Sequence, residues 1–223
     1  MSIAPADLRI DVRWLAPMTA RGIVLEHYSM VVRDGRILDI LPSSAAAQRY
    51  CAVVVLQRAS HLLMPGMINT HSDAARLLFR GVNDAGIADR FVSPEFTRDG
   101  LLAAIAEMLK SGVTCFYDDH YFPGETARTV AEQGMRAVLG MPIAESATPW
   151  AKDAAQSLTR SLRFRDEFNG HPLISTAFAP QSGKPLSDAT FARLATLADE
   201  LDAGISMELH RSNAEISQSI AAH

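Results

Sequence analysis

Side chains that can bind a metal ion or move protons follow directly after several apolar runs of this 223-residue sequence. In the stretch MPGMINTHSDAARLLFRG, a short apolar run leads to His71 and, two residues later, to Asp73. Glu208 and His210 repeat this spacing near the end of the sequence. Imidazole and carboxylate groups suit zinc or iron, and residues two apart on a strand point the same way, so each pair can reach one ion. The spacing alone is a weak signal, because a histidine and an acid at a strand end more often form a hydrogen-bonded surface pair.

A second polar group, Asp118-Asp119-His120, follows the run VTCFY, and Gln181 and Arg211 stand in similar positions further along. In a parallel α/β fold the carboxyl ends of the strands meet at one face, and sites are built there. We therefore expect all these residues on one face. The simpler interpretation of Asp118-Asp119-His120 is a solvated loop after a buried strand.

The elements that must position these residues follow two patterns. Residues 1–63 alternate between apolar and polar in the manner of strands, with Asp34-Gly35 as a hairpin turn, and predict a small antiparallel sheet. In residues 64–223, short β runs alternate with helical stretches, which predicts right-handed βαβ units and a parallel sheet. Strands are expected at 66–70, 113–118, 136–141, 173–179 and 205–209, and helices at 94–111, 124–133, 151–168 and 187–203.

The predicted fold class is α/β, with an incomplete (β/α)8 barrel after a small N-terminal β-sandwich portion. About five strands are visible where such a barrel needs eight, so we expect the barrel to be truncated after its fifth strand. Gly112, Gly134 and Gly204 are typical of positions just past helix ends.

Composition excludes several classes of function. The formal charge is −4, and the Lys and Arg residues are scattered, which argues against a nucleic-acid partner. Apolar runs such as AVVVL are far shorter than the roughly 18 residues that span a bilayer, and no signal pattern stands at the start, so we expect a cytoplasmic protein without a membrane partner. Cys51 and Cys115 form no C-x-x-C pair, so neither a disulfide framework nor a thiolate zinc site is indicated.

The chain resembles the amidohydrolase superfamily in stretches that cover essentially its whole length in order: LLMPGMINTHSDAARLLFRG, LLAAIAEMLKSGVTCFYDDHYFP, GMRAVLGMPI, TPWAKD, HPLISTAFAP and LADELD. Within it the chain resembles the methylthioadenosine/S-adenosylhomocysteine deaminase and chlorohydrolase branch, to which AIAEMLKSGVTCF is highly specific. The resemblance implies a (β/α)8 barrel with a β-sandwich built from both chain ends. It also implies one zinc or iron ion that activates a water to displace ammonia or chloride from a purine or triazine ring.

The resemblance also implies positions for the site. Members of the branch end their first barrel strand in His-x-His, both metal ligands, where this chain has His71 and Asp73. A ligand histidine on the fifth strand corresponds to Glu208, and the proton-shuttling glutamate three residues later corresponds to Arg211. The substrate-facing histidine after the fourth strand corresponds to Gln181. Only His71 keeps its residue type, and Arg211 cannot shuttle protons because a guanidinium stays protonated.

These substitutions favour a catalytically impaired deaminase fragment, a pseudoenzyme with no intact catalytic residue. Binding of zinc or iron, and of methylthioadenosine, S-adenosylhomocysteine or a triazine, is expected to be impaired with it. One alternative is an active metallohydrolase with a rebuilt site, in which His71, Asp73 and Glu208 bind the metal and Asp119 acts as the base. Another is a non-enzymatic subunit whose open barrel edge pairs with a second copy or with a full-length paralogue.

Overall fold

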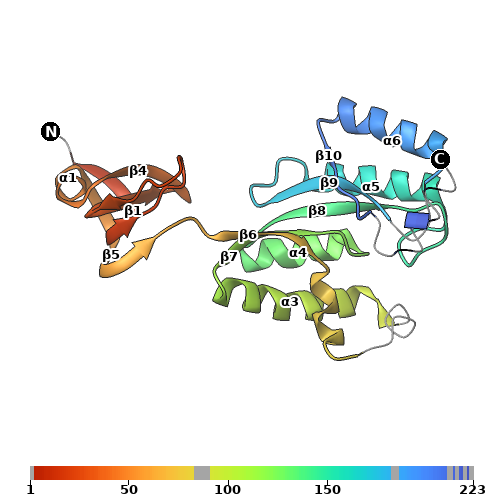
Figure 1. Cartoon of the computed structure of the whole chain (residues 1–223), viewed down its shortest axis with the longest axis horizontal. Coiled ribbons are helices and arrows are strands. Elements are labelled where there is room, and N and C mark those ends of the chain that lie inside the picture. Colours follow the sequence, from red (N-terminus) through yellow and green to blue (C-terminus); the bar gives the residue numbers. More distant parts are fainter. Residues whose placement is uncertain are drawn as a thin grey trace. The chain divides into compact units, whose positions relative to one another are not determined.

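The computed structural model divides the chain into two compact units, Met1–Gly66 and Met67–His223. The structure describes residues 3–82, 91–181 and 186–209, together with residues 213, 216, 217 and 220. Figure 1 shows the elements of each unit.

The first unit holds one mixed sheet of five strands and a short helix. Its elements are β1 (Ala4–Leu15), β2 (Leu25–Glu26), β3 (Tyr28–Arg33), β4 (Arg36–Pro42), α1 (Ser43–Arg49) and β5 (Tyr50–Leu63). Strand β1 pairs antiparallel with β2 and β3, and β3 pairs antiparallel with β4, as the alternating pattern predicts. The pairing of β5 with β1 is parallel, so the prediction of a purely antiparallel sheet is wrong for this strand. Helix α1 provides the crossover that lets the chain return in the same direction.

The predicted hairpin turn is confirmed. Asp34 and Gly35 connect the paired residues Arg33 and Arg36, and their φ angles are 52° and 69°. Positive φ at both central residues is the conformation of a type I′ turn, whose twist matches that of the flanking strands. The turn chemistry of the sequence therefore fixes the register of β3 and β4.

The second unit is a five-stranded parallel sheet with the order β10-β9-β8-β7-β6. Its strands are β6 (Met67–Ser72), β7 (Val113–Asp118), β8 (Arg136–Ile143), β9 (Ile174–Pro180) and β10 (Gly204–Ile205). Its helices are η1 (Ala74–Phe79), α3 (Pro94–Lys110), α4 (Pro123–Gln133), α5 (Ala154–Phe168) and α6 (Asp188–Glu200). The chain order and the parallel pairing confirm the predicted partial (β/α)8 barrel (Figure 1).

The core of this unit lies between the sheet and the helices that follow its strands. Phe116, Leu139 and Phe178 come from three neighbouring strands and are fully buried, and Leu101 and Val130 pack against them from α3 and α4. Burying a large apolar side chain of this kind stabilises a fold by about 1.5–3 kcal/mol. The apolar β runs of the sequence therefore become the central strands.

Helix boundaries follow the local chemistry of the chain. Ser93, Asp153 and Ser187 each accept a hydrogen bond from the backbone N–H three residues later and begin α3, α5 and α6. Helix α5 thus begins later than the predicted residue 151, because the Thr148 hydroxyl accepts from the backbone N–H of Ala151 and holds a turn there.

Gly112 and Gly134 lie just past helix ends with φ of 85° and 68°, as predicted. The same prediction for Gly204 is wrong, because Asp202 takes the left-handed conformation (φ 48°) after α6 and Gly204 starts β10. In the described part of the chain, no helix combines the length and the apolar character that crossing a membrane requires.

Candidate functional site

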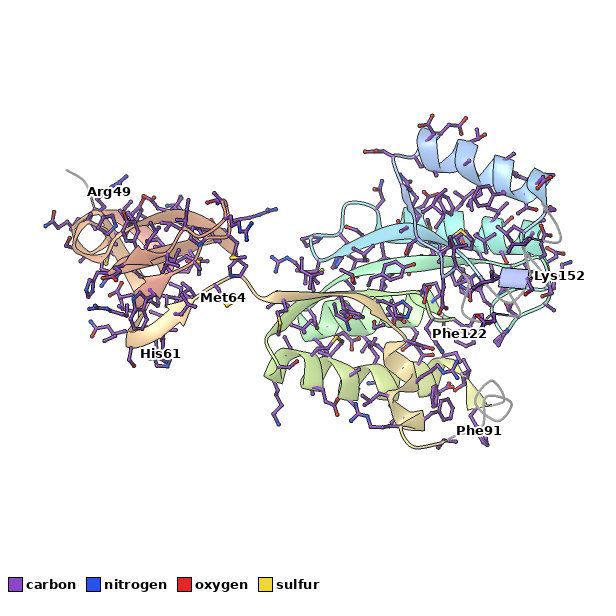
Figure 2. The ribbon with its side chains drawn as sticks, in the orientation of Figure 1. Arg49, His61, Met64, Phe91, Phe122 and Lys152 are labelled. Carbon is purple, nitrogen blue, oxygen red and sulfur yellow. The ribbon has the colours of Figure 1, made fainter. Side chains whose placement is uncertain are left out.

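The predicted site residues that the structure describes stand at the carboxyl ends of the barrel strands. His71 lies in β6, Asp73 follows this strand, Gln181 follows β9, and Glu208 lies three residues after β10. Arg211, with His210, lies outside the described residues. Phe122 and Lys152, labelled in Figure 2, mark the segments that follow β7 and β8 at the same end of the sheet.

Asp118 connects the ends of β6 and β7. Its side chain is buried, with 3% of the residue exposed, and its Oδ1 accepts a hydrogen bond from the backbone N–H of Ala74 at 2.8 Å. The Ser72 hydroxyl lies 3.3 Å from the same oxygen and donates to the Tyr117 carbonyl at 2.6 Å. Burial raises the pKa of Asp118 to about 6, although the hydrogen bond from Ala74 acts in the opposite direction. The carboxylate therefore fixes the chain on both sides of Asp73.

The docking of η1 on α3 also positions Asp73. Gly100 in α3 lies so close to η1 that a Cβ at this position would stand 2.2 Å from the backbone oxygen of Ala75. Arg80 forms a two-pronged ion pair with Glu107 in α3, with distances of 2.8 and 3.0 Å. Since η1 begins directly after Asp73, these contacts set where its carboxylate can point.

The Asp73 carboxylate stands between two nitrogen groups. Its Oδ1 is 3.5 Å from Nε2 of His120, and its Oδ2 is 3.4 Å from Nε of Arg76. Nδ1 of His120 lies 3.2 Å from the Tyr121 carbonyl oxygen, which can only accept a hydrogen bond, so Nδ1 can donate there in a tautomer that carries its proton. Only the imidazolium form of His120 can also donate from Nε2 to Asp73. The pair is thus a charge-assisted contact when His120 is protonated.

Asp119 shares the electrostatic environment of three predicted ligands. Burial raises its pKa; the negative charges of Asp73 and Glu208 raise it further, and His71 lowers it. A Cβ on Gly140 in β8 would lie 2.5 Å from the Asp119 Cβ, so only glycine leaves room for this side chain. The structure therefore brings His71, Asp73, Asp119 and Glu208 within electrostatic range of one another.

Gln181 makes local contacts at the end of β9. Its Nε2 donates to the Ala179 carbonyl at 3.3 Å, and its backbone N–H donates to the Ile143 carbonyl at 2.9 Å. The side-chain amide thus lies along its own strand end. The substrate-facing role of Gln181 stays a prediction.

The types of donor in this cluster suit zinc or iron, but their arrangement does not. Among the described residues, no three His, Cys, Asp or Glu side chains come together as a group that could hold a metal ion. Asp73 is also engaged with Arg76 and His120. In the part of the chain that the structure describes, Asp73 would have to leave these contacts before it could bind a metal ion.

Interpreting Asp118-Asp119-His120 as a solvated loop is wrong. Residues Asp118 and His120 are 3% and 8% exposed. They follow the buried Phe116 at intervals of two residues along the chain. This period of two was the signal in the sequence that could have revealed their burial. The contact of His120 with Asp73 could not have been found in this way, because it joins segments that are 47 residues apart in the sequence.

Comparisons with known proteins show the family of this chain. The model of the amidohydrolase family matches residues 62–223. The chain is 36% identical to a 5-methylthioadenosine/S-adenosylhomocysteine deaminase of Saccharophagus degradans, over 97% of this chain and 51% of the relative. It is 35% identical to the protein of the same name in Teredinibacter turnerae, over 96% of this chain and 51% of the relative. The chain thus spans about half the length of the curated relatives it matches.

Solved structures of longer proteins also superpose on this chain. A zinc-bound adenosine deaminase from Xanthomonas campestris superposes with a TM-score of 0.94 at 32% identity, over 100% of this chain and 53% of that chain. A zinc-bound atrazine chlorohydrolase from Arthrobacter aurescens superposes with a TM-score of 0.78 at 14% identity, over 96% of this chain and 56% of that chain. At that identity the second likeness supports the fold alone.

Proposed function

This chain belongs to the amidohydrolase family. We propose that it is related to metal-dependent deaminases that act on ring C–N bonds, and that its own site is catalytically impaired. The observation that carries the proposal is that, of five site positions assigned by resemblance, only His71 keeps its residue type. The contacts of Asp73 with Arg76 and His120 support this proposal, because they engage both oxygens of a carboxylate that stands at a metal-ligand position. The adenosine-type and triazine substrates are proposed from the names of the relatives.

The loss of a proton shuttle is the most damaging of these changes. In the family, zinc or iron supplies an activated water when bound, and a glutamate moves protons to the leaving group. Arg211 cannot accept a proton at any working pH, and its charge would repel a nearby dication. Gln181 offers an amide where a histidine is expected, so it can bind a ring substituent but cannot carry charge.

A rebuilt active site is the second candidate function. It is favoured by Asp119, whose pKa is raised by burial and by the negative charges of Asp73 and Glu208. In this version His71, Asp73 and Glu208 are the ligands and Asp119 accepts the proton, since a raised pKa suits a general base. It requires these side chains to move together from the positions described above.

The third candidate function is a non-enzymatic role as a subunit of a larger assembly. The proposed partners are a second copy or a full-length paralogue, and the charge of −4 argues against a nucleic-acid partner. We propose a cytoplasmic location for all three candidates.

The deciding experiment measures bound metal by plasma mass spectrometry on protein purified without chelator. Impaired catalysis predicts far less than one zinc or iron per folded chain, and no ammonia release from methylthioadenosine or S-adenosylhomocysteine. The His71→Ala variant and a matched His61→Ala variant, whose histidine lies in β5 of the first unit, are measured beside it. Stoichiometric metal that is lost only in His71→Ala, together with ammonia release, would refute impaired catalysis and support the rebuilt site.

A further inference from the structure

Arg76 is tied to Asp73 through both its backbone and its side chain. The backbone N–H of Arg76 donates a hydrogen bond to the Asp73 carbonyl oxygen at 3.0 Å, and Nε of Arg76 lies 3.4 Å from Oδ2 of the Asp73 carboxylate. A 3-10 helix such as η1 has three residues per turn, so the side chain at position i+3 stands over the side chain at position i. The local fold therefore holds a guanidinium beside this carboxylate.

Helix η1 is anchored on both sides of Arg76. At its start, the buried Asp118 accepts a hydrogen bond from the backbone N–H of Ala74 at 2.8 Å. At its end, Arg80 forms the two-pronged ion pair with Glu107 in α3, with distances of 2.8 and 3.0 Å. The backbone position of Arg76 is therefore set by these two anchors and does not depend on its own ion pair.

Both oxygens of the Asp73 carboxylate face a nitrogen group of this chain. Oδ2 faces Arg76 in η1, and Oδ1 lies 3.5 Å from Nε2 of His120, whose side chain is 5% exposed. Zinc binds a carboxylate oxygen at about 2.0–2.2 Å, so a zinc ion on Oδ2 would stand within about 6 Å of the Arg76 Nε. Zinc and the guanidinium therefore compete for the same carboxylate.

Charge favours the guanidinium in this competition. Arg76 is a permanent positive charge, because a guanidinium stays protonated at any working pH. Zinc carries twice that charge, so its repulsion by Arg76 across about 6 Å is at least as large as the attraction between Arg76 and Asp73 at 3.4 Å in the same medium. A zinc ion at Asp73 would thus have to overcome this repulsion and also replace the existing ion pair.

We propose that Arg76 takes the place of a metal ion as the counter-charge of Asp73 and thereby keeps zinc from this site. The inference rests on the proposed function, because only the resemblance places Asp73 at a metal-ligand position. It goes beyond that function by naming a residue of η1 that impairs the site and whose charge can be removed. A neutral side chain at position 76 should therefore restore part of the metal affinity.

The test measures zinc binding to the full 223-residue chain in competition with a chromophoric chelator. Arg76→Gln removes the charge and keeps a side chain that can donate a hydrogen bond to Asp73. It should bind zinc at least about tenfold more tightly than the parent, or bind zinc where the parent shows no binding, and Arg76→Met should give the same gain. Arg76→Lys keeps the charge and should stay within about threefold of the parent.

A matched arginine in α4 controls for the loss of an ion pair. Arg128 pairs with Glu125, the acid three residues before it, at 3.1 Å, and Arg128→Gln should leave the zinc affinity within about twofold of the parent. Asp73→Asn added to Arg76→Gln should abolish the gain, which separates this site from zinc bound by other histidines. The urea midpoint of Arg76→Gln should stay within about 0.5 M of the parent, because an ion pair whose side chains are 39% and 40% exposed contributes little to stability.

The proposal is overturned if Arg76→Gln and Arg76→Met bind zinc no more tightly than the parent, if Arg76→Lys gains as much as they do, or if the gain survives Asp73→Asn. Each of these outcomes compares a variant with the parent, so it is independent of how much metal the parent itself holds. A parent with stoichiometric zinc and ammonia release would refute impaired catalysis, and the comparison of the variants would still decide the role of Arg76.

Discussion

The close approach of α3 and η1 at Gly100 gives a quantitative prediction. In Gly100→Ala the new Cβ would lie 2.2 Å from the Ala75 oxygen and 2.9 Å from its carbonyl carbon. Contacts under 3.0 Å do not occur for real Cβ atoms, so the helices must move apart by about 1 Å. An overlap with three backbone atoms falls in the upper part of the usual overpacking range, at about 2–3 kcal/mol, and the better helix propensity of alanine returns about 1 kcal/mol. The expected net loss is about 1–2 kcal/mol.

Urea unfolding of the second unit measures this loss. The chain has two tryptophans, Trp14 and Trp150, so a Trp14→Phe background makes fluorescence report on the second unit alone. With a slope of about 2 kcal/mol per molar urea, the midpoint should fall by about 0.5–1 M at an unchanged slope.

A second glycine-to-alanine variant controls for helix propensity. Gly124 also lies in a helix, and the nearest atoms to its new Cβ are the flexible Arg128 guanidinium nitrogens at 3.7 and 3.8 Å. Gly124→Ala should therefore leave the midpoint unchanged or raise it. A Gly100→Ala protein as stable as the parent would show that α3 and η1 do not pack as described and that their contact does not position Asp73.

Three further predictions concern local features. The folded-state pKa of Asp118 is raised to about 6 from 3.8, so its contribution to stability should fall as the pH rises from about 4 to 6. Asp118→Asn should flatten this dependence when urea unfolding is measured across that pH range. Asp153→Ala should cost about 1 kcal/mol in thermal unfolding, because the carboxylate accepts from the Gln156 N–H at 2.8 Å; an unchanged melting temperature would contradict the cap. Gly35→Ala should destabilise the first unit by about 1 kcal/mol, read from Trp14 fluorescence, whereas Asp34→Asn should be neutral.

Much of the fold could be predicted because it depends on short-range patterns. The β7 strand was expected at residues 113–118 and is found there, since its apolar run ends at a polar group and starts after a glycine. The hairpin at Asp34-Gly35 and the helix ends at Gly112 and Gly134 follow from backbone conformations that few other residues adopt at low cost.

Two wrong predictions depend on contacts that the hydrophobic pattern does not show. Helix α5 was predicted too early because the Thr148 turn competes with helix over its first residues. The parallel return of β5 beside β1 depends on a partner strand at the start of the chain, and alternation along β5 says nothing about the direction of that partner.

The sequence by itself determined the family pattern, the order of strands and helices, and which polar residues follow each strand. Only the tertiary structure decided that Asp118 is buried as an anchor for Ala74, that Asp73 lies between His120 and Arg76, and that Gly140 makes room for Asp119. These relations join segments that are distant in the chain, and their energies depend on burial and on distances of a few ångströms. Residue types and spacing carry no such distances, so they could place the site at one end of the barrel but could not describe its contacts.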